Sequence, residues 1–112
     1  MAYETRCWKI KIKSGSIDRV REWAQTINER RNEALATLRD ETVIIESVFL
    51  DRTEDTDYLI AVMRAESFER SGEAVRTSAH EIDKYHHQFK RDVWEERTEL
   101  ELLVDLERLS EI

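Results

Sequence analysis

The spacing of apolar residues changes several times along this chain, and these changes constrain the fold more than any other feature of the sequence. Apolar and polar residues alternate over residues 5–13, which is typical of a half-buried strand. Apolar residues then recur every three or four positions over residues 17–39, which predicts one amphipathic helix. Two further strand-like runs, 42–50 and 58–65, are joined by the polar segment 51–57 and predict a β-hairpin.

Helical spacing returns after Glu66 and continues to Val93, which is long for a single helix in a small domain. Residues 78–81 have the form of a capping box, in which a hydroxyl and a carboxylate three positions later satisfy free backbone N–H groups at a helix start. We therefore predict a break near Ser78 that divides this stretch into two helices. Residues 98–106 alternate leucine and valine with acidic residues, which predicts a final half-buried strand.

The resulting order is β-α-β-β-α-α-β. Right-handed crossovers place the two βαβ units side by side, as in ferredoxin-like folds, with the strand order 4-1-3-2. The predicted fold class is therefore α+β, with a four-stranded antiparallel sheet and all helices on one face. The chain has two glycines and no proline, so no linker divides it and residues 1–112 are expected to form one domain. The uncovered face is left to water, a second subunit or a ligand.

Charged and apolar residues are both expected on this uncovered face. Pairing Leu50 with Tyr58 across the hairpin places Glu46 and Arg64 there, beside Lys9 of the first strand. We expect Lys9, Glu46 and Arg64 to bind a small polar ligand. Aliphatic residues on the same face favour a homodimer with the sheets face to face, and a solvated face with paired charges is the alternative.

All three histidines of the chain lie close together in the second half of the sequence. At about 100° per residue, His80 and His87 are almost in line on a helix, with Asp83 nearby, so these three residues are a candidate metal site. Alternatively, Asp83 orients His86 for acid–base chemistry, and His80, Asp83 and His86 form a candidate catalytic set. A capped, solvated helix face with one semi-buried histidine is the simpler interpretation.

Composition excludes several classes of function. The net charge of −7 opposes binding to nucleic acid. No apolar run approaches the ~20 residues of a membrane span, and the N-terminus lacks the features of a signal peptide, so we expect a cytoplasmic protein without a membrane partner. Cys7 is the single cysteine, which excludes an internal disulfide and a multi-cysteine zinc site. Phosphate-binding loops, nucleophile elbows and HExxH pairs are absent, and the sequence leaves the cofactor unknown.

Several short motifs are spread over nearly the whole chain. They are Lys11–Ile12–Lys13–Ser14–Gly15, Glu46–Ser47–Val48–Phe49–Leu50, Asp57–Tyr58, Met63–Arg64, His80–Glu81–Ile82–Asp83 and Tyr85–His86. In these motifs the chain resembles a family of functionally uncharacterised prokaryotic proteins of about this length. Members often have proline where this chain has Glu81. The wider resemblance is to dimeric α+β barrels, which include cofactor-free monooxygenases, heme-degrading enzymes, muconolactone isomerase-like proteins and ligand-sensing domains. This resemblance implies only that His80, Asp83, His86, Glu46 and Arg64 are the positions to test.

We therefore predict a homodimeric ferredoxin-like domain that binds a small polar molecule or a protein partner. The alternative is a cofactor-free monooxygenase-like or isomerase-like enzyme of the dimeric-barrel type, with a histidine and aspartate acid–base or metal site. A second alternative is a structural interaction module. Fold by itself carries little functional weight, because one architecture supports many activities.

Overall fold

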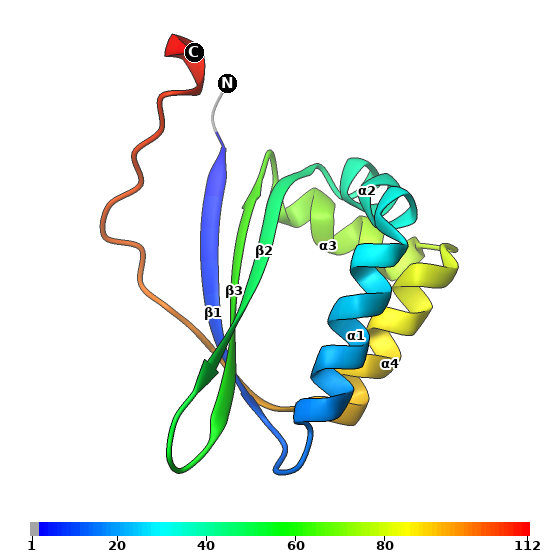
Figure 1. The fold of residues 1–112 in the computed structure, drawn as a ribbon. Coiled ribbons are helices and arrows are strands. Elements are labelled where there is room, and N and C mark those ends of the chain that lie inside the picture. The colour runs from blue at the N-terminus through cyan, green and yellow to red at the C-terminus, as the bar shows by residue number, and fades with distance from the viewer. Residues whose placement is uncertain (1–2) are drawn as a thin grey trace.

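A four-stranded antiparallel sheet carries the helices on one face (Figure 1). The structure is a computed structural model that describes residues 3–112. The strand order is β2-β3-β1-β4, as the sequence predicted. The elements are β1 (Glu4–Ile12), α1 (Ile17–Glu29), α2 (Arg31–Asp40), β2 (Val43–Arg52), β3 (Asp57–Ala65), α3 (Phe68–Thr77), α4 (Glu81–Val93) and β4 (Trp94–Glu99), followed by a short 3-10 helix, Leu109–Glu111. In the described part of the chain, no helix is both long and apolar enough to cross a membrane.

The core forms where β1 meets α1 and α4. Ile10 and Ile12 alternate inward from β1 and are almost fully buried. They belong to one apolar cluster with Trp23 of α1 and with Phe89 and Val93 of α4. Because burying each of these side chains contributes roughly 1.5–3 kcal/mol, this cluster fixes both long helices against the sheet.

The predicted helix over residues 17–39 is two helices in the structure. Arg30 has φ −99° and ψ 38°, which ends α1, and α2 begins at the next residue. The Arg30 guanidinium donates two hydrogen bonds, of 2.6 and 2.7 Å, to the Glu33 carboxylate in the first turn of α2. Neither glycine nor proline stands at this break, so the prediction of one helix was wrong for want of a local signal. Figure 1 shows α2 turning away from the line of α1.

The break predicted near Ser78 is confirmed, because α3 ends at Thr77 and α4 begins at Glu81. The cap differs in detail from the predicted box. Ser78 Oγ accepts a hydrogen bond from the His80 backbone N–H at 3.2 Å and donates one to the carboxylate of Asp83. His80 is the N-cap residue and makes no side-chain cap hydrogen bond, and the carboxylate that bonds to Ser78 is that of Asp83 and not that of Glu81.

The last strand lies earlier than the sequence predicted. β4 begins directly after α4, and its pairing with β1 ends at Trp8 and Glu99. Beyond it, the Leu100 backbone N–H donates to the Cys7 carbonyl at 2.8 Å, and the following residues to 108 form no strand. In Figure 1 this C-terminal segment runs on the side of the sheet opposite the helices. The predicted strand over residues 98–106 is therefore wrong for all but its first two residues.

The hairpin register also differs from the prediction by one residue. Leu50 pairs with Leu59, whereas Tyr58 pairs with Asp51. Because side chains alternate between faces, this shift moves the residues of β2 from Ile45 onward to the opposite face from the one predicted, whereas a bulge between Val43 and Ile45 leaves Val43 paired with Ala65 and buried. Glu46 lies opposite Met63 and faces the helices.

Candidate ligand-binding pocket

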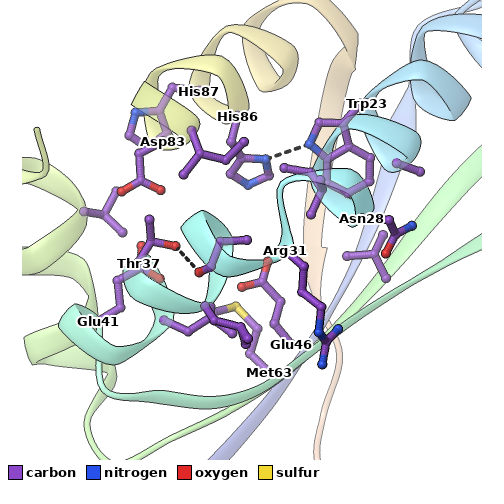
Figure 2. Close-up of a pocket in the computed structure, with 18 of the residues that line it drawn as sticks. Trp23, Asn28, Arg31, Thr37, Glu41, Glu46, Met63, Asp83, His86 and His87 are labelled. Carbon is purple, nitrogen blue, oxygen red and sulfur yellow. Dashed lines mark hydrogen bonds between the residues drawn. The ribbon is translucent and has the colours of Figure 1, made fainter. Parts of the chain in front are cut away.

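A cavity of about 480 Å³ lies between the helices and the sheet. Figure 2 shows its walls, which come from α1, α2 and α4 on one side and from β2 and β3 on the other. Much of the lining is apolar and includes Ile27, Leu38, Ile82 and Trp23. The titratable side chains that line it are Arg31, Glu41, Glu46, Asp83, His86, His87 and Lys90. A mostly apolar cavity with a few convergent polar groups is typical of a small-molecule site.

His86 is held in one protonation state by its neighbours. The Trp23 indole N–H donates to His86 Nδ1 at 3.0 Å, and the two rings are stacked with centroids 5.6 Å apart. Burial, followed by the charges of Lys90 and His87, lowers the pKa of His86 to about 3. The imidazole is therefore neutral near pH 7, with its proton on Nε2 because Nδ1 accepts. In this state His86 is a fixed hydrogen-bond donor and not a general base.

Asp83 does not orient His86. The Asp83 side chain is buried, and its carboxylate accepts a hydrogen bond from the Ser78 hydroxyl, which precedes α4. No hydrogen bond joins Asp83 to His86 in the described residues; the ring partner of His86 is Trp23. The predicted Asp83 and His86 pair is therefore brought into one cavity, but the expected carboxylate–imidazole contact is absent there.

His80 lies outside the cavity lining. Its Nε2 is 2.7 Å from the carboxylate of Asp40, and this contact joins the start of α4 to the end of α2 on the surface. The hydrogen bond to Asp40 raises the pKa of His80. In the described residues, no group of three or more His, Cys, Asp and Glu side chains is arranged to hold a metal ion. The structure therefore does not bring His80, Asp83 and His87 together as a ligand set.

Glu41 is the pocket residue that sequence reasoning missed. It follows α2 directly, is 8% exposed and lines the cavity. Burial, then the charges of Asp83 and Glu46, raises its pKa to about 7. No residue described by the structure donates a hydrogen bond to its carboxylate. The carboxylate oxygens are nevertheless not completely buried, and the residue lines the cavity, so solvent or a ligand can reach them from there. Glu41 is thus an unpartnered carboxyl group facing the pocket.

The backbone beside Glu41 is unusual. Thr42 has φ 61°, in the left-handed region that a β-branched residue rarely adopts. Its hydroxyl donates to the Ser67 carbonyl at 3.2 Å, and its own carbonyl accepts from the Glu66 N–H at 2.9 Å. The Ser71 hydroxyl donates to the Glu41 carbonyl. These contacts with the start of α3 hold the chain reversal that places Glu41 at the cavity.

Glu46 and Lys90 complete the ionisable lining. Glu46 lies on a wall of the pocket with protein on several sides, and solvent still reaches its side chain because the pocket is open. Burial raises the pKa of Glu46, and the positive charge of Lys90 opposes this shift. Burial lowers the pKa of Lys90, whose Nζ lies 4.9 Å from the centroid of the Trp94 ring. Asp83, His86 and Lys90 recur at spacings of three and four along α4, a signal that was visible in the sequence.

The predicted ligand set of Lys9, Glu46 and Arg64 is divided between the two faces of the sheet. Lys9 Nζ lies 4.3 Å from the centroid of the Tyr58 ring on the uncovered face. Arg64 is on the same face, where it donates to Thr5 Oγ1 at 3.0 Å and to the Asp105 carboxylate at 2.6 Å. Glu46 faces the pocket instead, because of the register described above. The three residues therefore cannot contact one small ligand.

Fold and site together define a ferredoxin-like α+β domain with an internal pocket between its helices and sheet. Comparison with known proteins adds the family. Residues 3–111 match the family of unknown function DUF6176, and the chain belongs to that family. The resemblance predicted from the sequence is confirmed at this level. A search of curated proteins gave no match.

Solved structures are similar in fold. A protein from Shewanella oneidensis has 15% sequence identity and a TM-score of 0.52, over 88% of this chain and 93% of that chain. A proposed antibiotic biosynthesis monooxygenase from Bacillus cereus has 18% identity and a TM-score of 0.47, over 96% of this chain and 98% of that chain. The strand order β2-β3-β1-β4 and the similarity to the Shewanella oneidensis protein confirm the ferredoxin-like fold class, and identities this low carry no activity across to this protein.

Proposed function

We propose that this protein binds a small organic molecule in the cavity between its helices and its sheet. The cavity of about 480 Å³ carries this proposal, because ligand pockets are usually a few hundred to a thousand cubic ångströms and mostly apolar. Polar groups within it are already oriented without a ligand, since Trp23 fixes the His86 ring and Thr42 fixes the backbone beside Glu41. Such preorganisation lowers the entropic cost of binding.

The binding unit that we propose is a homodimer formed through the uncovered face of the sheet and the C-terminal segment. In water this surface exposes many large apolar side chains, which is costly for a monomer. They include Phe49 at 60% exposure, Leu103 at 81%, Val104 at 72% and Leu106 at 88%. The segment is anchored to its own sheet by the Asp105 contacts with Arg64 and Thr5, so its leucines are presented outward. A second copy of the chain would cover both surfaces in one symmetric interface.

A proton-transfer enzyme that uses the same cavity is the second candidate. The observation that favours it is the Glu41 carboxyl group, whose pKa of about 7 suits a general base at neutral pH. In such an enzyme Glu41 would be the general base, in place of the His80, Asp83 and His86 set predicted from the sequence. The Nε2–H group of His86 would donate a hydrogen bond to the substrate. The monooxygenase-like and isomerase-like reactions, and the interaction module, stay predictions.

A fragment screen by protein-observed NMR tests the binding proposal. Fragments that enter the cavity should shift backbone signals of α1, α2 and α4 together. Ala34→Phe fills the cavity from α2 and should abolish these shifts, whereas Ala79→Phe places the same ring on an exposed position and should preserve them. Native mass spectrometry of the tag-free protein reports subunit number and any retained small molecule. If no fragment perturbs the pocket signals, or if the Ala34→Phe variant binds as well as the wild type, the pocket is not a ligand site.

A further inference from the structure

The charges around the pocket are unbalanced. Carboxyl groups approach it from three different elements: Glu41 follows α2, Glu46 lies on β2 and Asp83 lies on α4. Figure 2 shows these three side chains on separate walls of the same cavity. The cations that line it are Lys90 and Arg31, and Arg31 is exposed at the start of α2. The charged residues of the lining that are buried, Glu41 and Asp83, are therefore both acidic, and Glu46 adds a third carboxyl group at the more open part of the pocket.

These acids have no ion-pair partner among the residues that the structure describes. None of the ion pairs in the described part of the chain includes Glu41, Glu46, Asp83 or Lys90. Asp83 accepts a hydrogen bond from Ser78, but no described residue donates a hydrogen bond to the Glu41 carboxylate, and Glu41 as a residue is 8% exposed. A buried carboxylate without a donor is costly unless a partner of opposite charge reaches it. The cavity beside Glu41 is the place from which such a partner can come.

The remaining lining suits the body of an organic cation. The rings of Trp23, His86 and Phe89 pack against one another, with centroid distances from Trp23 of 5.6 Å to His86 and 4.5 Å to Phe89, and Trp23 and His86 both line the pocket. His86 is neutral, so it adds no positive charge that would repel a cation. Aromatic faces attract cations, and aliphatic walls accept the hydrocarbon part of a ligand. The net charge of −7 also favours the approach of a positively charged molecule.

We propose that the pocket takes a small organic cation, a protonated amine on an apolar or aromatic body, with its ammonium group against the Glu41 carboxylate. This inference rests on the proposed function, because it names the ligand class of the same cavity. The Glu46 and Asp83 charges add to the attraction, and the aromatic wall of Trp23 and His86 holds the apolar body. The competing ligand class is an organic anion that pairs with Lys90, which is disfavoured because three carboxyl groups surround that lysine.

Three probes that share an aromatic body and carry a cationic, a neutral and an anionic polar group test the inference by isothermal titration calorimetry at about pH 8. They are phenylethylamine, phenylethanol and phenylacetate, which share one aromatic body. In the wild type, phenylethylamine should bind at least about tenfold more tightly than phenylethanol, and phenylacetate should bind most weakly. Glu41→Gln should remove the preference for the amine while leaving the affinity for the alcohol unchanged. Glu73→Gln, an exposed position on α3, is the matched control and should keep the preference.

Each other outcome overturns the inference in a distinct way. Equal affinities for the amine and the alcohol would leave the pocket as a binding site but remove the role of charge. Tightest binding of phenylacetate would show that Lys90 sets the ligand class. If none of the probes binds at millimolar concentration, the cation inference is wrong, and the fragment screen decides separately whether the pocket binds any ligand. Glu46→Gln gives a second variant should Glu41→Gln perturb the fold.

Discussion

Replacing Glu41 with glutamine should make the protein more stable, and by an amount that depends on pH. Glu41 is 8% exposed, and its surroundings raise its pKa from 4.5 to about 7. Between these two values the folded protein keeps the proton, whereas the unfolded chain releases it. Because one pKa unit corresponds to 1.36 kcal/mol, the free energy of unfolding falls by about 3 kcal/mol as the pH rises across this range. Above this range Glu41 causes no further change, because it is ionised in both states.

Glutamine has nearly the same shape as glutamic acid and does not titrate, so the variant avoids this loss. The free energy of unfolding of Glu41→Gln, relative to wild type, should therefore rise by about 3 kcal/mol from about pH 4 to about pH 8. Urea denaturation at several pH values and one protein concentration measures this difference. Several groups face Glu41 and set the size of the effect. They are Asp83 and Lys90 of α4, Glu46 of β2 and Asp40 of α2.

Glu73→Gln on the exposed face of α3 is the control and should show no such trend. A difference between Glu41→Gln and wild type that changes by less than about 0.5 kcal/mol over the same pH range would refute the reasoning. It would mean that water or a rearranged neighbour solvates the carboxylate as well in the folded state as in the unfolded chain.

Three further predictions concern other contacts of the fold. Trp23→Phe removes the donor to His86 Nδ1 and should lower the free energy of unfolding by roughly 1–3 kcal/mol in urea denaturation, and unchanged stability would contradict the role of this bond. Asp40→Asn should lower the free energy of unfolding below about pH 6.5, where His80 is charged in both the folded and the unfolded state. This loss of stability should vanish as the pH rises through the raised pKa of His80 in the folded protein. A loss that persists at about pH 9 would argue against the ion pair. Val62→Asp places a charge on the uncovered face of the sheet and should raise the dissociation constant of the proposed dimer more than about a hundredfold, measured by native mass spectrometry. Thr53→Asp in the hairpin loop is the control and should leave this constant unchanged. A Val62→Asp dimer as tight as the wild-type dimer would place the interface elsewhere.

Local patterns in the sequence were sufficient for the order of strands and helical segments, except that they did not divide residues 17–39 into α1 and α2. The alternation around Ile10 and Ile12 predicts β1 because period two places both side chains on one face, and both are buried in the core. The polar tetrad at Ser78 predicts the break between α3 and α4 because free N–H groups at a helix start need local acceptors. Right-handed crossovers then leave one strand order, which the structure confirms.

The candidate site was predictable only in part. Asp83, His86, His87 and Glu46 were chosen from the sequence, and all four line the pocket. Their partners were not predicted correctly, because a side chain on a helix can be placed on a face but not paired across the domain. Trp23, 63 positions earlier in the chain, holds His86 in place of Asp83.

The sequence by itself determined the kinds of element, their order and the fold class, because these depend on hydrophobic period, caps and chain connectivity, which act over a few residues. The tertiary structure decided the hairpin register, the bend at Arg30 and the raised pKa of Glu41. The raised pKa of Glu41 in particular depends on burial and on charges of α4 and β2, which lie on separate elements of the fold. A register shift of one residue costs little locally, but it decides whether Glu46 faces the uncovered sheet surface or the pocket.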